Sequence, residues 1–272
     1  MKIKTVLVKY GGNAMIDFQS EERAVNEIAE LHRNGHRVIV VHGGGPFIKS
    51  LLDEADVETE FVYGHRKTDE NTMRYVEMAL SGEVNGRLVA KLNKLGVPAV
   101  GLSGKDACMI DVVRRKSKVF TDKDEQNIDI GFVGDVNSVD SSLVNLLSDN
   151  GYLSVISPVS MSKNGDTYNI NADMFAGSLA ACFPVDNYIV LTDINGIRKD
   201  VNNPETRIPF LNLSSARKLI SKIEGGMIPK LESCMTALEG GAGSAHIVEG
   251  NEKLSLKTVL EDSGNKGTSL KK

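Results

Sequence analysis

The chain has 272 residues, of which 41% are hydrophobic and 25% charged, and its formal net charge is −4. This length suits one large α/β unit or two lobes that share a sheet. The mild acidity excludes a protein that binds nucleic acid mainly through a basic surface. The short basic cluster Arg114–Lys118 is interpreted as a solvated hairpin rather than as a binding patch.

The cysteines and the apolar runs bear on the compartment. Cys108, Cys182 and Cys234 are far apart and odd in number, which favours neither a disulfide framework nor a zinc site. We interpret them as reduced core thiols of a cytoplasmic protein. The apolar run after Met1 is short and is broken at Lys9, so we expect no signal peptide. No run approaches the length of a membrane-spanning helix, and no membrane partner is expected.

Short, β-branched and nearly continuous apolar runs recur along the chain. Such runs are typical of strands that are buried on both faces of a parallel sheet. The predicted strands are Ile3–Lys9, Arg37–His42, Val97–Leu102, Tyr152–Pro158, Tyr188–Asp193 and Ala245–Gly250.

Helical patterns alternate with these strands. Ser20–Gly35 carries a serine cap and a terminal glycine, and Asp69–Leu95 has an apolar stripe at spacings of three or four residues. Further helices are predicted within 171–183, 214–221 and 229–241. The alternation predicts a three-layer α/β/α sandwich with a mainly parallel central sheet. Two polar-turned strand pairs, within 108–120 and 128–139, predict a small antiparallel elaboration.

Two early strands end in glycines. Lys9 closes the first strand and is followed by Gly11–Gly12, and Gly43–Gly45 follow the second strand just before a helix. In an open α/β sheet, ligands bind beyond the carboxyl ends of the strands, and the N–H groups at a helix start attract anions. A lysine that extends from a strand end beside a tight turn would also explain the first group, and close packing of helix and strand would also explain the second. No Walker A loop and no GxGxxG motif occurs.

Polar residues precede two of the helices. Arg66 stands before the long helix and either pairs with Asp69 and Glu70 or clamps a substrate carboxylate. Asn169 and Asn171 are two apart on an extended segment and therefore point the same way. Helix capping by Asn171 or Asp173 is the simpler reading of that segment, but it leaves Asn169 unexplained.

Two later segments complete the set of polar positions. Thr192 and Asp193 end a buried strand, and Gly196 makes the turn, which suits contact with a nucleotide. Pro229 fits a first helical position and places Lys230 in the first turn. A cation is unfavourable there, so we expect an anion nearby, such as a phosphoryl group in transit.

Seven segments, in this order along the chain, resemble the amino acid kinase family. They are KYGGNAM, VVHGGGP, GHRKTDENTM, VGLSGKD, NINAD, LTDINGI and GGMIPKL, and the resemblance extends from about Lys2 to about Val248. Within the family, the motifs look most like those of members that phosphorylate the γ-carboxylate of N-acetyl-L-glutamate in arginine biosynthesis. The resemblance implies an ATP-dependent phosphotransferase that makes an acyl phosphate.

The resemblance implies a role for each matching position. The implied catalytic residues are Lys9, Lys230 and Asp173, the last of which orients the two lysines. The implied acceptor-binding residues are Gly44, Gly45, Arg66 and Asn169. The implied nucleotide-side residues are Gly12, Thr192, Asp193 and Gly196. A carboxylate acceptor is already ionised at neutral pH, so no general base is needed, and His42 beside the glycines is not assigned one.

The resemblance also implies features beyond the site. Mg²⁺ arrives with ATP and needs no dedicated protein ligands. An acceptor lobe covers about 1–183, and a nucleotide lobe covers about 184–272. The family forms homodimers, for which the long helix is a candidate surface. The chain begins at its first predicted strand without a preceding helix, so we expect insensitivity to arginine. The polar end of the chain leaves a last strand open.

Two alternatives remain at this stage. A kinase of the same fold could act on another acidic acceptor, such as N-succinylglutamate, an aminoadipate derivative, aspartate or carbamate. A ligand sensor on the same scaffold would be expected to lack one of the two lysines or the aspartate, and all three are present.

Overall fold

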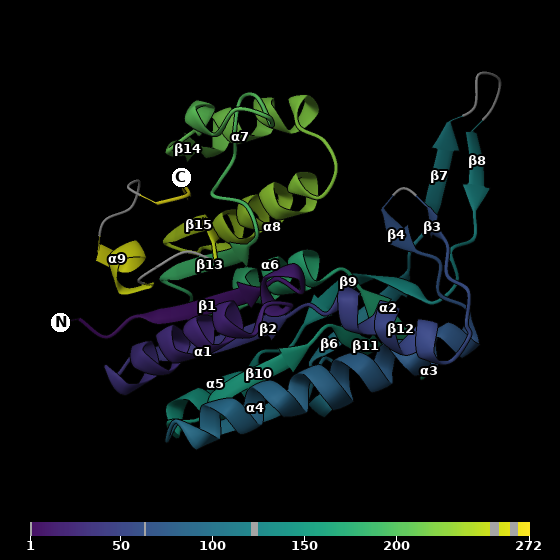
Figure 1. The fold of residues 1–272 in the computed structure, drawn as a ribbon, viewed down its shortest axis with the longest axis horizontal. Helices are drawn as coiled ribbons and strands as arrows, with labels where there is room; N and C mark the ends of the chain where they lie inside the picture. Colours follow the sequence, from purple (N-terminus) through teal and green to yellow (C-terminus); the bar gives the residue numbers. More distant parts are fainter. Residues whose placement is uncertain (1, 63, 121–124, 251–255, 262–265) are drawn as a thin grey trace.

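The computed structural model describes residues 2–62, 64–120, 125–250, 256–261 and 266–272. Its centre is an eight-stranded sheet in the order β14-β16-β15-β13-β1-β2-β10-β5 (Figure 1). Neighbours from β15 to β5 are parallel, and β16 runs antiparallel to β15. The predicted, mainly parallel α/β/α sandwich is therefore confirmed.

The strands of this sheet lie close to their predicted positions. Six of them correspond to the six predicted runs, and β14 and β16 are additions near the end of the chain. The final strand that the sequence left open is therefore present. The bounds are β1 Thr5–Tyr10, β2 Arg37–His42, β5 Ala99–Ser103, β10 Leu153–Ser157, β13 Asn187–Thr192, β14 Phe210–Asn212, β15 Ser244–Glu249 and β16 Thr268–Lys271.

Helices cover both faces of the sheet and bury a separate core on each. One core includes α1 (Phe18–Arg33), α4 (Asn85–Lys94) and α9 (Leu256–Glu261). The other includes α5 (Ser142–Asp149), α6 (Ala172–Cys182), α7 (Leu213–Leu219) and α8 (Met227–Gly240). Along β1, Val6 and Val8 face the first core and Leu7 faces the second, as the two-residue period of a strand requires.

The cap of the first helix differs from the prediction. Asp17, not Ser20, is the N-cap of α1, and its carboxylate accepts a 2.7 Å hydrogen bond from the Ser20 backbone N–H. The serine therefore lies in the first turn. The helix ends as predicted, because Gly35 follows it with a φ of +85°.

The long helix is continuous but contains a π-helical segment. It comprises α3 (Glu70–Glu77), the π-helical segment Met78–Val84 and α4, and Asp69 caps its start. The buried stripe contains Val76, Leu80, Val84, Leu88 and Leu92, which are spaced by four residues throughout. That spacing exceeds the 3.6-residue turn of an α-helix, so a straight helix would rotate the stripe away from the core. The wider turn of the π segment keeps the stripe facing inward.

The predicted antiparallel elaboration is part of a small closed barrel. The strands β6 (Ile110–Arg114) and β9 (Val133–Val139) come from the two different predicted pairs and run antiparallel to each other, so the expected pairing within 108–120 and within 128–139 is wrong. The strands β11 (Val159–Met161) and β12 (Thr167–Ile170) close the ring. Two further hairpins project beside it (Figure 1), formed by β3 (Phe61–Val62) with β4 (His65–Arg66) and by β7 (Ser117–Phe120) with β8 (Glu125–Ile128). The short helix α2 (Gly45–Glu54) follows β2.

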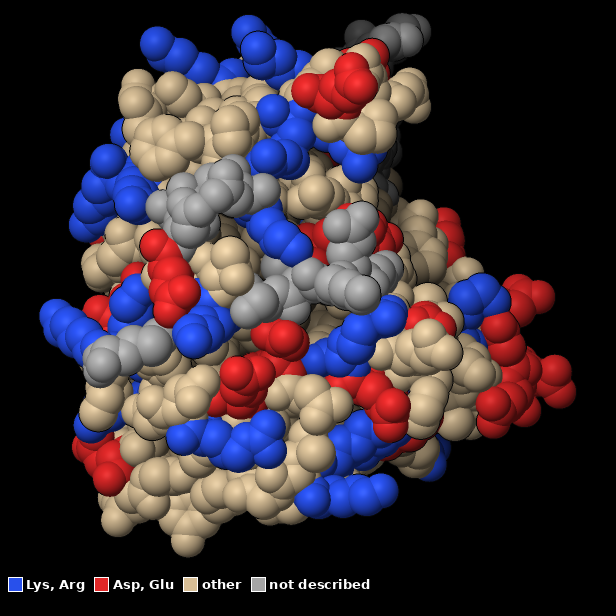
Figure 2. Space-filling view, turned by 60° about the vertical axis from the view of Figure 1, so that its left-hand side comes forward, with Lys and Arg blue, Asp and Glu red and all other residues tan. Residues whose placement is uncertain are grey.

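The interpretation of Arg114–Lys118 as a solvated hairpin is wrong in one respect, because this segment connects β6 in the barrel to β7 in a separate two-stranded sheet. Two cysteines also differ from their interpretation. Basic and acidic side chains both occur across the face drawn in Figure 2. Arg114 is exposed and pairs with Asp129. Cys234 is buried, but Cys108 and Cys182 are exposed, because they lie in a short turn and at the end of α6. None of the described helices is long and apolar enough to cross a lipid bilayer.

Two buried histidines make stability depend on pH. Burial lowers the pKa of both His42 and His246 to about 4, from the ordinary 6.5. Between these values the unfolded chain binds protons that the folded chain does not, so stability falls as the pH is lowered from 6.5 towards 4. At pH 5.5 we expect each histidine to reduce the free energy of unfolding by about 1.4 kcal/mol relative to pH 7.5.

Urea denaturation of the wild type and of His246→Asn at pH 7.5 and 5.5 measures this contribution. On acidification, the free energy of unfolding of the variant is expected to fall by about 1.4 kcal/mol less than that of the wild type, because the variant lacks one of the two histidines. Equal losses in the two proteins would contradict the assignment.

Candidate active site

Lys9 is directed to one face of the sheet by the strand that carries it. It lies two residues after Leu7 on β1, so it points to the face that α6 and α8 cover. The side chain of Lys9 is only 5% exposed. A buried ammonium group requires a partner, and the partner comes from the start of α6.

Asp173 and Lys230 meet because α6 and α8 pack closely. The Cα of Gly177 faces Ser233 on α8, and a Cβ at Gly177 would lie 2.8 Å from the Ser233 Cα. Gly177 is one turn beyond Asp173, and Ser233 is nearly one turn beyond Lys230, so the close approach brings the two charged side chains together. α8 begins at Met227, which places Pro229 at the third helical position rather than the predicted first. Lys230 still lies at the end of the first turn.

The Asp173 carboxylate bridges the two lysines. Its Oδ1 lies 2.9 Å from the Lys9 Nζ, and its Oδ2 lies 3.1 Å from the Lys230 Nζ. Burial acts to raise the pKa of Asp173, but the two lysines outweigh burial and hold the pKa below its usual range. Burial and the charge of Lys230 lower the pKa of Lys9, against the opposing effect of Asp173. Two cations share one anion, so the cluster attracts further negative charge.

The two glycine groups predicted at the strand ends lie against each other. A Cβ at Gly12 would lie 2.9 Å from the Gly44 backbone N and 3.1 Å from the Gly45 backbone N. Only a bare backbone allows this approach. α2 starts at Gly45, so its first N–H groups add the positive end of a helix to the same place.

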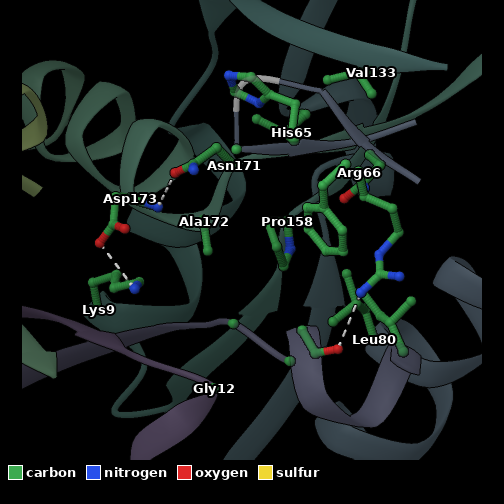
Figure 3. Close-up of a pocket in the computed structure, with 18 residues that line it drawn as sticks. Lys9, Gly12, His65, Arg66, Leu80, Val133, Pro158, Asn171, Ala172 and Asp173 are labelled. Atoms are coloured by element: carbon green, nitrogen blue, oxygen red, sulfur yellow. Dashed lines mark hydrogen bonds and ion pairs between the residues drawn. The ribbon is translucent and has the colours of Figure 1, made fainter. Parts of the chain in front are cut away.

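A cavity of about 240 Å³ connects this region to Arg66. Figure 3 shows Lys9 and Asp173 on one side of the cavity and Arg66 on the other. The predicted residues Gly12, Gly44 and Gly45 line the space between them. The strand ends therefore converge on one site.

Arg66 faces the cavity without an anionic partner. The residue is 7% exposed, and its guanidinium donates to the Thr59 hydroxyl at 2.8 Å and to the Gly45 carbonyl at 3.4 Å. It also lies 4.7 Å from the centre of the Phe61 ring. Within the described parts of the chain, Arg66 forms no ion pair with a carboxylate, and Asp69 instead caps α3. The alternative in which Arg66 pairs with that helix is therefore wrong.

The two asparagines have different positions, as the sequence suggested: Asn171 caps a helix and Asn169 does not. The Asn171 side chain accepts hydrogen bonds from the backbone N–H groups of Asp173 and Met174, at 2.9 and 3.3 Å, and so caps α6. Asn169 lies on β12 and lines the cavity, and its amide is 3.5 Å from the Thr68 hydroxyl. Barrel pairing positions it, because its backbone N–H donates to the Phe132 carbonyl at 2.9 Å.

The model of the amino acid kinase family matches residues 4–249. The chain belongs to this family. A protein named acetylglutamate kinase from Methanocaldococcus jannaschii is 42% identical over 261 residues, covering 95% of this chain and 86% of that protein. Another of the same name from Heliobacterium modesticaldum is 42% identical over 267 residues, covering 97% of this chain and 90% of that protein.

A solved structure supports the amino acid kinase fold. Carbamate kinase from Giardia lamblia, bound to AMP-PNP, has a TM-score of 0.69 and 18% identity, with 98% of each chain covered. At this identity the likeness concerns the fold alone.

The remaining residues predicted for the family's nucleotide side lie outside this cavity. Thr192 donates to the Asp193 carboxylate at 2.9 Å, and Asn13 donates to its other oxygen at 3.2 Å. Burial acts to raise the pKa of Asp193, but these hydrogen bonds outweigh it and lower the pKa. A second cavity, of about 690 Å³, shares Asp173 and Asn171 with the first and reaches Lys230.

Sequence reasoning missed the apolar walls of the first cavity. They include Ile48, Phe61, Leu80, Val133 and Pro158, which come from α2, β3, the π segment, the barrel and the chain after β10. These residues have no shared spacing, so only the packing of distant elements brings them together.

Gly196 has a structural reason to be glycine. Its φ is +77°, and a Cβ there would lie 2.7 Å from the Gly267 backbone carbon and 2.8 Å from the Thr268 backbone N. We expect Gly196→Ala to lower the free energy of unfolding by about 1–3 kcal/mol. Urea denaturation measures it, with Gly82→Ala as control, because a Cβ at Gly82 meets nothing within 4 Å. Wild-type stability in Gly196→Ala would refute this account of the turn.

Proposed function

We propose that this protein transfers the γ-phosphoryl group of ATP to the γ-carboxylate of N-acetyl-L-glutamate, as a step of arginine biosynthesis. The observation that carries the proposal is a cavity with a buried guanidinium that forms no ion pair in the described chain at one end, and with Lys9 and Asp173 at the other end, where Asp173 also binds Lys230. The acceptor carries a carboxylate at each end, which matches these two positive regions. The identity to the two named kinases supports the same acceptor.

The acceptor is held at its α-carboxylate end in this proposal. Arg66 offers its planar guanidinium to the α-carboxylate, and the Asn169 amide adds a hydrogen bond. The γ-carboxylate then extends along the cavity towards Gly44 and Gly45. This arrangement positions the attacking oxygen before any chemistry occurs.

The reaction itself needs positioning and positive charge. A γ-carboxylate oxygen attacks the γ-phosphorus of ATP, a new P–O bond forms, and the bond to the β,γ-bridging oxygen breaks to release ADP. No proton is transferred, because the attacking carboxylate is already ionised. Lys9, Lys230 and the N–H groups of Gly44 and Gly45 stabilise the charge on the moving phosphoryl group. Asp173 holds the two ammonium groups on either side of its carboxylate and orients them towards the reaction centre.

The nucleotide side includes Gly12, Thr192, Asp193 and Gly196 in this proposal. The nearby carboxylates do not offer a free ligand set for Mg²⁺, because Asp173 bonds two lysines and Asp193 bonds Thr192 and Asn13. We therefore assign the ion no protein ligands, and it arrives with its phosphate and water ligands. When bound, it neutralises phosphate charge.

The wider assignments stay predictions. They are a cytoplasmic homodimer, contact through the long helix, an acceptor lobe over about 1–183 and a nucleotide lobe over about 184–272. The strands after residue 183 lie together at one end of the sheet, next to β1, which supports the division. Met78 on the long helix is 51% exposed, which supports a contact there.

An acceptor screen with hydroxylamine tests the reaction. The amine attacks the acyl carbonyl of an acyl phosphate, releases phosphate and leaves a stable hydroxamate. We expect hydroxamate with N-acetylglutamate and ATP at a rate at least about tenfold above that with N-succinylglutamate, aminoadipate derivatives, aspartate or carbamate. A faster rate with another acceptor would correct the substrate. No product with any acceptor would overturn the kinase assignment.

The two lysines are expected to act on the transition state. Lys9→Met and Lys230→Met should each lower kcat by at least about 100-fold and change the KM for N-acetylglutamate by less than about threefold. Lys49→Met is the matched control, because Lys49 is exposed and its one ion pair among the described residues is with Asp53 in its own helix. Steady-state kinetics of the wild type and the three variants measure kcat and the KM for N-acetylglutamate. Unchanged turnover in either active-site variant would refute its role.

A further inference from the structure

Next to the glycine loop, Gly43–Gly45, lie two buried residues, His42 and Asn85, that the proposed reaction does not use. His42 is the last residue of β2 and is 0% exposed. Its Nδ1 lies 2.9 Å from the Gly43 carbonyl oxygen, and its Nε2 lies 3.1 Å from the Asn85 Nδ2. Asn85 is 5% exposed and is the first residue after the π segment.

The contacts of Asn85 determine which histidine nitrogen carries the proton. The same amide nitrogen lies 2.9 Å from the Val155 carbonyl and 3.3 Å from the Leu102 carbonyl. Carbonyl oxygens only accept, so the nitrogen of Asn85 must face them and donate. The Nε2 of His42 therefore accepts, and the proton is on Nδ1, which donates to Gly43. Burial lowers the pKa of His42 to about 4, so the ring is neutral at physiological pH.

This hydrogen bond controls the direction of an N–H group in the cavity. The Gly43 carbonyl and the Gly44 N–H belong to the same planar, trans peptide unit and point in opposite directions. Fixing the carbonyl on His42 therefore fixes the Gly44 N–H, which lies beside Gly12 at the cavity. In the described parts of the chain, this N–H has no hydrogen-bond acceptor.

The π segment supports the pair from the other side. The Cα of Gly44 packs against this segment, since a Cβ there would lie 2.5 Å from Leu80 and 3.4 Å from Val84. Asn85 itself fits because Gly101 on β5 has no side chain, and a Cβ at Gly101 would overlap the Asn85 side-chain oxygen. The π segment therefore packs against Gly44 of the glycine loop and also positions Asn85, the residue that follows it.

We infer that His42 and Asn85 are positioning residues that orient the Gly44 N–H towards the phosphoryl group in transit. The inference rests on the proposed function. His42 exchanges no proton with substrate and only holds a peptide plane. Since the loop has three glycines and so is intrinsically free, an external support supplies the preorganisation that charge stabilisation requires.

Kinetics of two His42 variants test the inference. His42→Phe keeps an apolar ring of similar size and removes the donor, and we expect kcat to fall at least about tenfold with the KM for both substrates changed less than about threefold. Asparagine can place an amide nitrogen where Nδ1 lies, so His42→Asn should retain kcat within about threefold of wild type. His246→Phe is the control for a buried histidine elsewhere, and its turnover should be unchanged.

Nitrogen NMR separates this inference from the function on which it rests. In the wild type, the ¹⁵N shifts of His42 should report a proton on Nδ1 and a bare Nε2, and the Gly44 amide resonance should move in His42→Phe but not in His42→Asn. This arm needs no activity, so it decides the inference even if the acceptor screen yields no hydroxamate.

Several results would overturn it. They are a proton on Nε2, equal losses of kcat in both His42 variants, an effect confined to KM, or an equal loss of turnover in His246→Phe. If His42→Phe does not fold, His42→Leu replaces it. Leucine also has no donor for the Gly43 carbonyl, so kcat should again fall at least about tenfold, and unchanged kcat would contradict the inference.

Discussion

The carboxylate of Asp173 is the interaction on which the rest of the site depends. The buried ammonium group of Lys9 on β1 and the half-buried one of Lys230 on α8 would repel each other and lack a counter-charge without it. The aspartate lies in the first turn of α6, where the positive end of the helix favours a negative charge. Removing one partner from such a buried set typically costs about 3–5 kcal/mol, so the arrangement is sensitive to every member.

The charges of the cavity suit two anionic substrates. Lys9 and Arg66 line the first cavity and Lys230 lies beside it, whereas Asp173 is the one carboxylate that lines this cavity in the described chain. The excess positive charge is divided between the two ends of the cavity, and the glycine N–H groups lie between them. A dicarboxylate acceptor and a phosphoryl group together neutralise it. The positive charge is therefore preorganised, and substrate binding supplies its counter-charge.

The hydrophobic pattern of the sequence predicted the strands, the helices and the layered architecture. The apolar runs located the six main strands, and the alternation with helices gave the correct architecture, because buried parallel strands and amphipathic helices leave direct traces in sequence. The convergence of Lys9, Gly12, Gly44 and Gly45 also followed, since strand ends of a parallel sheet meet at one edge. The role of Arg66 in binding the acceptor carboxylate, and the acceptor itself, were predicted from the family resemblance.

Other features depend on contacts between distant residues. The closed barrel requires β11 and β12, whose short runs do not reveal their pairing partners, and the exposure of Cys108 depends on a turn with a φ of +52°. The π segment did leave a trace in the four-residue spacing of its stripe. The close packing of α6 on α8 likewise has a visible signal in Gly177, although its meaning emerges only when Ser233 is opposite.

The central claim is that one aspartate aims two lysines at a phosphoryl group in transit. A crystal structure with ADP, Mg²⁺, tetrafluoroaluminate and N-acetylglutamate tests it most directly, because the fluoride complex mimics the transferring group. The account predicts both Nζ atoms and the Gly44 N–H within about 3 Å of fluorine atoms, with Asp173 still between the lysines. A complex in which either lysine is bonded only to Asp173 and does not contact the mimic would contradict it.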